Sequence, residues 1–329
     1  TTGASNVAVG ANALDANTTA TNNTAVGNVA LGANTTGQHN AAFGGAALDA
    51  NTTGEENTAL GAFALSANTT ADFNTAVGMS ALEANTTGAS NTAVGRRALL
   101  VNTTGTRNVA VGTETLDAST TASDNTAIGR KCFTEITTGN ENTGVGINCG
   151  LNLTTGSTNT CVGSEAGHDL TGGSNNLLLG KSAGRSNSPS GQLQNSNNQI
   201  CLGNNTSDAA FIKISLTVTS DRRDKTDITD FTHGLSWINK LRPVTYRWDM
   251  RSNYENGIPD GSKKEQKLNI GLLAQEELEI EKEHGFANSK NDTLLVNENA
   301  DGNYGMHYDR LVPILVNAIK ELSAKVTAL

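Results

Sequence analysis

The sequence is poor in aromatic residues, and those it has are unevenly placed. Aromatic side chains make up 4% of the chain, and both Trp and all four Tyr lie after residue 219. Residues 1–219 are instead repetitive and rich in Gly, Asn and Thr. This contrast predicts two parts of different construction, a repetitive one before residue 220 and an ordinary mixed globular one after it.

Further absences exclude whole classes of protein. No stretch approaches the roughly 18 apolar residues of a membrane-spanning helix, so we expect no membrane insertion. Residues 1–219 carry 14 acidic and 8 basic residues, and residues 220–329 carry 18 and 15. Neither part has the positive charge that nucleic acid binding needs. The Cys show no Cys-x-x-Cys spacing and no two His share a motif, so no metal site and no cofactor are expected.

A glycine recurs every 17 residues through the first part of the chain. The series runs without interruption from Gly10 to Gly180, and an Asn lies four residues before each member. The unit reads N-T-A-V-G-x-x-A-L-x-A-N-T-T-G-x-x, and a further unit at Gly203 follows six extra residues within 186–197. A strict odd period with β-branched and turn residues predicts a β-solenoid over residues 1–203. Residues 1–6 already belong to the repeat, so we expect no signal peptide and a start inside a longer protein.

Two apolar positions in each unit are predicted to build the solenoid core. The first immediately precedes the Gly, as at Val9 and Val26, and the second lies four residues after it, as at Leu14 and Leu31. Ala must fill the rest, so the core is thin and one coil cannot stand alone. Stacking of coils, and association of several chains, are expected to supply the remaining burial.

The recurring Asn and Thr are predicted to form ladders at the turns, bonded to their equivalents one coil away. Asn-Thr-Thr also spells an N-glycosylation acceptor, but the motif follows the coil period, which favours ladders. A Thr column could also indicate ice binding, yet neighbours such as Thr18 and Thr19 would point to opposite faces of a strand. The acceptor positions are Asn17, Asn34, Asn51, Asn68, Asn85 and Asn102.

The four Cys stand where other units mostly hold small residues, which predicts buried structural side chains. Cys132 and Cys149 are equivalent in successive units, so a disulfide between them is geometrically possible. The insertion within 186–197 is predicted to be a solvated loop, with ligand binding as the alternative. Residues 212–218 then alternate apolar and polar, which predicts a strand in the connecting segment 204–219.

The repeat unit, for example N-T-A-I-G at residues 125–129, resembles head repeats of trimeric autotransporter adhesins and repeats of phage tail fibres. The boundary after residue 219 carries the segment S-D-R-R-D-K-T-D-I at 220–228. This segment resembles the opening of the C-terminal intramolecular chaperone of endosialidase-type phage tailspikes, with a pattern of about S-D-x-R-x-K-x-x-I. Residues 269–276 resemble the G-x-x-A-Q-E segment of that family, and residues 308–322 resemble its terminal helix.

The resemblance implies a trimeric chaperone domain that drives assembly of the preceding fibre and then releases itself. It implies cleavage between Thr219 and Ser220 by a Ser/Lys dyad, with Ser220 as nucleophile and Lys225 as base. A serine hydroxyl needs such a base, and a lysine can serve only when neutral, in a buried or cation-rich setting. We expect trimer packing to create that setting, so that cleavage reports correct folding. Without the resemblance, a Ser–Lys pair in a charged run is an ordinary solvated turn.

The residues between the predicted dyad members are expected to support it. Asp221 follows the nucleophile, and Arg222 and Arg223 are the cations that would favour a neutral lysine. Asp224 departs from the family pattern, and a carboxylate beside Lys225 would hold the lysine charged and slow the cleavage.

Residues 220–329 are predicted to form a small α+β domain. We expect a helix over 235–241, a strand over 244–248, a strand-to-helix transition over 268–283, and a hairpin over 294–304 that turns at Asp301 and Gly302. The final helix is predicted to carry a coiled-coil seam, with an ordinary core helix as the alternative. The seam residues are Leu311, Leu315, Ala318, Leu322 and Leu329, with Ile319 and Val326 as a second stripe.

The sequence as a whole predicts the distal part of a trimeric phage tail fibre, assembled in the host cytoplasm and carried on the virion. Its expected partners are further copies of itself, a host cell-surface receptor such as a glycan, and other tail proteins. Alternatives are a bacterial trimeric surface adhesin with the same module, a trimerisation cap that does not cleave, and a glycan-cleaving enzyme. The last lacks support, because the repeats show no recurring carboxylate pair and Asp15, Asp49 and Asp117 share one variable position. Ions bound along a trimer axis stay an open possibility.

Overall fold

A computed structural model describes residues 2–207, 212–213, 218–298 and 302–329. The chain divides into two compact units, Thr1–Thr206 and Ser207–Leu329. The strand predicted over 212–218 falls mainly on residues 214–217, which lie outside the described residues.

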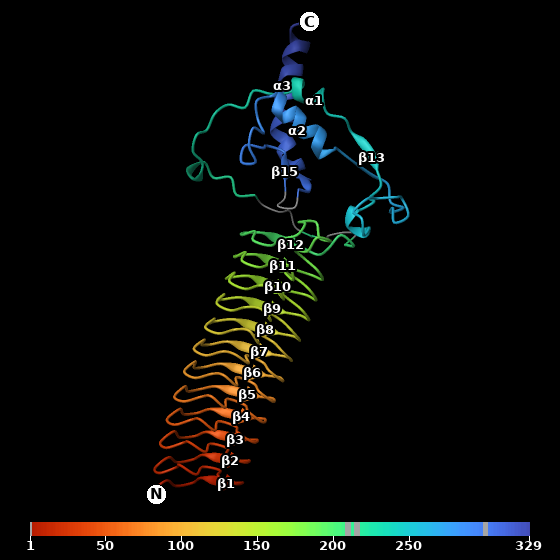
Figure 1. The fold of residues 1–329 in the computed structure, drawn as a ribbon. Helices are drawn as coiled ribbons and strands as arrows, with labels where there is room; N and C mark the ends of the chain where they lie inside the picture. The colour runs from red at the N-terminus through yellow and green to blue at the C-terminus, as the bar shows by residue number, and fades with distance from the viewer. Residues whose placement is uncertain (1, 208–211, 214–217, 299–301) are drawn as a thin grey trace. The chain divides into compact units, whose positions relative to one another are not determined.

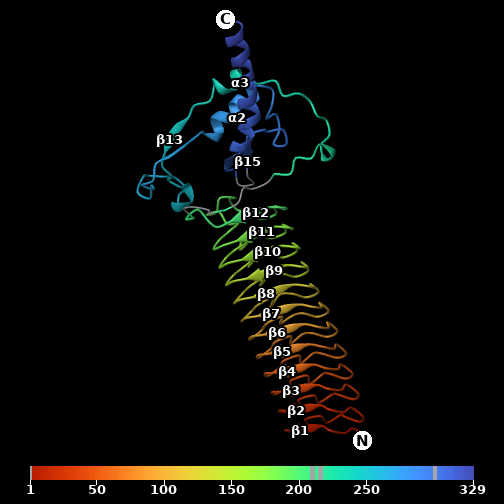
Figure 2. The ribbon, with the colours of Figure 1, turned by 180° about the vertical axis from the view of Figure 1, so that it is seen from behind.

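The first unit is a β-solenoid in which every coil contributes one short strand (Figure 1). In the described part of the chain, twelve three-residue strands pair in chain order into one parallel sheet. Figure 2 shows the same order from behind. Equivalent residues pair, as Thr75 does with Thr92, so the 17-residue period and the mainly β fold class are confirmed. The strands are β1 Val7–Val9, β2 Thr24–Val26, β3 Ala41–Phe43, β4 Thr58–Leu60, β5 Thr75–Val77, β6 Thr92–Val94, β7 Val109–Val111, β8 Thr126–Ile128, β9 Thr143–Val145, β10 Thr160–Val162, β11 Leu177–Leu179 and β12 Ile200–Leu202.

The central residue of a strand points into the core, whereas the sequence predicted this for the last residue of the strand. Side chains alternate along a strand, so the central Ala59 of β4 is buried while Thr58 and Leu60 on either side are exposed. The prediction that the apolar residue before each Gly fills the core is therefore wrong. The second predicted position is right, because Leu31 and most of its equivalents are fully buried.

The core changes composition in the later coils. Gly150 and Gly167 replace the core Leu, and Leu153 and Leu170, which stand at the position of the ladder Asn, are fully buried instead. A β-carbon on Gly150 would lie only 2.2 Å from Cε1 of Phe133, so this aromatic ring occupies the space that the glycine leaves. The later coils therefore fill the same core space with side chains from other positions of the repeat.

The insertion within 186–197 packs onto the solenoid, contrary to the prediction of a solvated loop. Leu193 joins the apolar core, and its backbone N–H donates to the carbonyl oxygen of Gly184 at 2.9 Å. Ser188 is also buried, with Oγ accepting from the N–H of Gly184 at 3.2 Å. These contacts let the twelfth strand continue the sheet despite the extra residues.

The predicted Asn ladders are confirmed. Nδ2 of Asn51 donates to Oδ1 of Asn34 one coil away at 2.9 Å, and to the carbonyl oxygen of Gly54 at 3.0 Å. In a second column, the backbone N–H of Asn91 donates to Oδ1 of Asn74 at 2.9 Å. Both columns are almost wholly buried, which leaves no room for a glycan on residues such as Asn51. The four Cys are likewise buried, as predicted, and all are free thiols.

The second unit is a small α+β domain. It pairs β13 with β14 and β15 with β16, both antiparallel. The elements predicted near 235–241, 244–248, 268–283 and 294–304 are confirmed, although Asp301 of the predicted turn lies outside the described residues. Its elements are η1 Arg222–Asp224, α1 Leu235–Ile238, β13 Val244–Tyr246, η2 Arg251–Asn253, β14 Asn269–Gly271, α2 Ala274–Glu283, β15 Val296–Glu298, β16 Tyr304–Met306, η3 Tyr308–Arg310 and α3 Leu311–Thr327.

Helix α3 turns one face to the core of this domain and leaves another exposed. Ile314 is buried with Trp237, and Leu311 packs against the same cluster. Ala318 is buried as well, so Leu311 and Ala318 are wrongly placed in the predicted coiled-coil seam. The exposed apolar residues of the helix and its end are Val312, Leu315, Val316, Ile319, Leu322, Val326 and Leu329.

The glycine that directly follows a strand, such as Gly44 after β3, has no space for a side chain. Gly44 has a φ of +142°, and a β-carbon there would lie 2.5 Å from the carbonyl oxygen of Gly61 in the next coil. We expect Gly44→Ala to lower the free energy of unfolding by about 3 kcal/mol, from backbone strain and overpacking. Denaturant titration followed by circular dichroism measures the loss.

Gly45→Ala is the matched control for this substitution. The neighbouring Gly45 has no atom within 4 Å of an added β-carbon, so its replacement should leave stability nearly unchanged. Equal losses for Gly44→Ala and Gly45→Ala would contradict the assignment of the constraint to the close approach of the coils.

Candidate functional site

The chain turns back on itself directly after Ser220. Oδ1 of Asp221 accepts from the backbone N–H of Arg223 at 2.9 Å and caps the short helix η1. The backbone N–H of Lys225 then donates to the carbonyl oxygen of Arg222 at 3.2 Å, which closes the turn. Nζ of Lys225 donates to Oγ of Ser220 at 2.6 Å. A purely local turn therefore brings together the two residues predicted as a dyad.

The charged residues around this pair are arranged differently from the expectation. Nη2 of Arg223 lies 2.6 Å from Oδ2 of Asp221, and this guanidinium holds the pKa of the Asp221 carboxyl below its usual value. Arg223 is thus neutralised by Asp221 and adds little positive field at the lysine. In the described part of the chain, Lys225 forms no ion pair with a carboxylate, Asp224 included.

Ser220 and Lys225 are both exposed to solvent, as is Thr219 on the other side of the predicted cleavage site. In the hydrogen bond between them, Nζ of Lys225 is the donor and Oγ of Ser220 is the acceptor. The single chain therefore does not supply the buried setting that was expected around Lys225.

A buried carboxylate that the sequence analysis missed organises the domain behind this junction. Glu281 of α2 is fully buried and accepts three backbone N–H bonds, from Leu294 and Leu295 at 2.7 Å and from Val296 at 2.9 Å. These bonds attach the start of β15 to α2. The sequence did offer a signal for this buried carboxylate. Glu277 and Glu281 lie four residues apart, on a helix face that also carries the apolar Ile280.

Glu277, one turn earlier on α2, lies against an aromatic cluster. Its Oε1 accepts from Nε1 of Trp237 at 2.7 Å, while Oε2 is buried with no hydrogen-bond partner among the described residues. Trp237 stacks on His284 at 4.6 Å between ring centroids, and His233 meets His284 edge-on at 4.9 Å. Burial, reinforced by the nearby charge of Glu281, raises the pKa of Glu277 to about 7.

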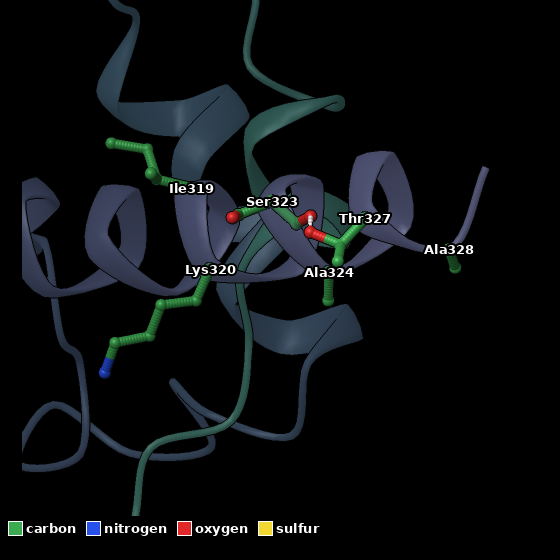
Figure 3. A pocket seen from close by; sticks show the side chains of 6 residues that line it. All are labelled: Ile319, Lys320, Ser323, Ala324, Thr327 and Ala328. Atoms are coloured by element: carbon green, nitrogen blue, oxygen red, sulfur yellow. Dashed lines mark hydrogen bonds between the residues drawn. The ribbon is translucent and has the colours of Figure 1, made fainter.

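The described residues form no metal site and no membrane-spanning helix, and they show a shallow hollow. No group of three or more His, Cys, Asp or Glu there could hold a metal ion. Among the same residues, no helix has both the length and the apolar character needed to cross a membrane. A shallow hollow runs along α3, and Figure 3 shows its six lining side chains. All come from this one helix and its end, so the hollow is an open groove: Ile319, Lys320, Ser323, Ala324, Thr327 and Ala328.

Comparison with known proteins points to one family. A family model described as the chaperone of endosialidase matches residues 220–286. Searches of the curated proteins and of the solved structures each found no match. The matched stretch begins at Ser220 and includes Lys225, residues 269–276 and helix α2. The resemblance drawn from the sequence is therefore confirmed for this stretch, whereas residues 308–322 lie beyond it.

Glu277 should make the stability of the domain depend on pH. Its folded pKa of about 7 exceeds the ordinary 4.5, so the unfolded chain releases this proton first as pH rises. We therefore expect the free energy of unfolding to fall between about pH 4.5 and 7 and then to level off. Glu277→Gln keeps an acceptor for Trp237 and should remove this component, as measured by urea titrations that follow Trp fluorescence across that range.

Glu279→Gln, an exposed acid on the same helix, serves as the control and should leave the pH slope as it is. If the Glu277→Gln protein keeps the slope of the parent, then Glu277 is ionised in the folded state throughout this range.

Proposed function

We propose that this chain is the distal part of a trimeric phage tail fibre whose C-terminal domain directs assembly and then detaches. The observation that carries this proposal is the Ser220–Lys225 hydrogen bond at the start of the stretch similar to the chaperone of endosialidase. The solenoid would serve attachment to a host receptor, for which a glycan is the expected class. The protein would be assembled in the host cytoplasm with other tail proteins and carried on the virion.

The proposed cleavage needs only the two side chains and one water molecule. Lys225, once neutral, takes the proton of the Ser220 hydroxyl, and the serine oxygen attacks the carbonyl carbon of Thr219. The bond from that carbon to the Ser220 nitrogen breaks, and the lysine returns its proton to the departing amine. Water then hydrolyses the ester between Thr219 and Ser220 and regenerates the hydroxyl. The products are a Thr219 carboxylate and a new N-terminus at Ser220.

The exposure of Lys225 connects this reaction to assembly. A lysine in water keeps its proton, whereas burial against other chains favours the neutral form. Cleavage would then follow correct association and not precede it. Asp221 supports the reaction by capping the turn that aligns the pair, and it leaves Arg222 as the neighbouring cation that favours a neutral lysine.

Helix α3 supports self-association through its exposed face. Val312, Leu315, Ile319, Leu322 and Val326 follow a 3-4-3-4 spacing, and each is at least 43% exposed. This is the pattern of a coiled-coil seam. β-branched residues alternating with Leu favour two strands in parallel coils, whereas the resemblance to the chaperone implies three chains. The mass of the native protein decides between these numbers.

Cleavage is tested by the intact mass of freshly purified protein. We expect fragments 1–219 and 220–329 from the parent, and a whole chain from Ser220→Ala and from Lys225→Arg, because arginine stays protonated. Thr226→Ala, which removes an exposed hydroxyl nearby, should still cleave. A parent that stays whole as a folded oligomer would reject autoproteolysis and leave residues 220–329 as a permanent trimerisation cap.

The role of α3 is tested by placing a charge on its seam. Ile319→Asp should reduce the native mass measured by light scattering to that of fewer chains, because the carboxylate would be buried between helices. It should also slow cleavage at least tenfold if cleavage depends on association. Lys320→Asp, at the exposed neighbouring position, should change neither property. An unchanged mass for Ile319→Asp would remove α3 from the assembly interface.

A further inference from the structure

We infer that the outward face of the sheet β1–β12 is the surface along which copies of this chain pack side by side. The proposed function assigns assembly to residues 220–329, and this inference goes beyond it by giving the solenoid an interface of its own. It shares with the proposed function only the association of chains, and it is independent of cleavage.

The face carries an unbroken column of apolar side chains. The third residue of every strand is Val, Ile, Leu or Phe, and it points away from the core because the central residue points inward. Leu60 is 49% exposed, Ile128 42% and Leu202 58%, and Phe43 also lies open at 41%. A soluble single chain rarely exposes a continuous apolar stripe, and such stripes mark interaction surfaces.

The face is also free of charge. The first residue of each strand is Thr, Ala, Val, Leu or Ile, so no strand of the sheet carries an acid or a base. The charged residues of the solenoid lie at other positions of the coils, as Arg107 and Asp124 do in their exposed ion pair. The strand face is thus uncharged, and charged side chains lie elsewhere on the coils. Protein interfaces have the same composition, with an apolar core that is buried and a polar rim around it.

The size of the face suits contact between whole chains. Twelve strands about 4.8 Å apart form a stripe about 55 Å long, and a three-residue strand makes it about 10 Å wide. The footprint is then about 550 Å² per chain, or about 1,100 Å² for a pair, near the lower end of stable interfaces. Contacts at other parts of the chain would add to this area.

A second copy of this chain is the occupant that fits a repeating surface. The apolar side chains recur once per coil, so a partner must have the same spacing to stay in register along all twelve strands. A copy rotated about an axis parallel to the solenoid has that spacing, and it sets each strand beside its own equivalent. Leu60 would then face Leu60, and Ile128 would face Ile128. The bulk of these residues is thereby removed from water in every chain.

Thiol cross-linking of the full-length chain tests this arrangement. In the Ser220→Ala background, Leu60→Cys and, independently, Ile128→Cys should each give covalent multimers with a short bis-maleimide. Thr70→Cys is the matched control, because it is exposed and lies ten positions further along the coil that contains Leu60. We expect it to cross-link at least tenfold less. The native Cys are buried and should stay unreactive in the folded protein.

The native mass, measured by light scattering on the same samples, separates the possible outcomes. Associated chains that cross-link through both column positions and not through Thr70→Cys support the inference. Associated chains that cross-link equally at all three positions, or only at Thr70→Cys, overturn it and leave the proposed assembly through residues 220–329 intact. A monomeric protein overturns both. Circular dichroism matching the parent shows that each variant is folded, and two column positions guard against the loss of one.

Discussion

The direct stacking of one coil on the next is the constraint on which the solenoid depends. Parallel strands pair residue for residue, and at the glycines that follow strands β1 to β10, Gly10 to Gly163, the backbone of one coil lies against the carbonyl group of the next. No β-carbon fits between them, and the positive φ of these glycines would strain other residues. Both conditions recur once per coil, so the period of 17 residues is a consequence of packing. The insertion within 186–197 is tolerated because its extra residues fold onto the core and leave the strand stacking unchanged.

The same stacking distributes apolar side chains between the inside and the outside of the solenoid. A strand of three residues turns one side chain inward and two outward, so the interior receives a small Ala from each of the strands β2 to β8. The large aliphatic residue at the end of the strand goes to the surface instead. Internal stability therefore rests on Leu, Ala and the buried Asn ladders, while the strand ends leave apolar side chains on the surface. The side chains that stabilise the inside of a coil and the apolar side chains on its surface thus come from different positions of the same repeat.

The contact between Ser220 and Lys225 is formed by a local turn of the chain. An aspartate-capped turn is enough to hold a lysine against a serine five positions earlier, without help from the rest of the domain. The chemistry that this pair could perform depends on its surroundings, because only a neutral lysine accepts a proton.

The sequence by itself determined every feature that depends on residues close together in the chain. The period, the solenoid and the adjacency of Ser220 and Lys225 all follow from local spacing and turn chemistry. The tertiary structure alone decided which side of each strand faces inward, because both sides offer apolar residues and the choice depends on where the rest of the coil closes. It likewise decided the inward face of α3, and it brought Trp237 to Glu277 across 40 residues of chain. Contacts of this kind are set by the packing of distant elements, and no local pattern in the sequence encodes them.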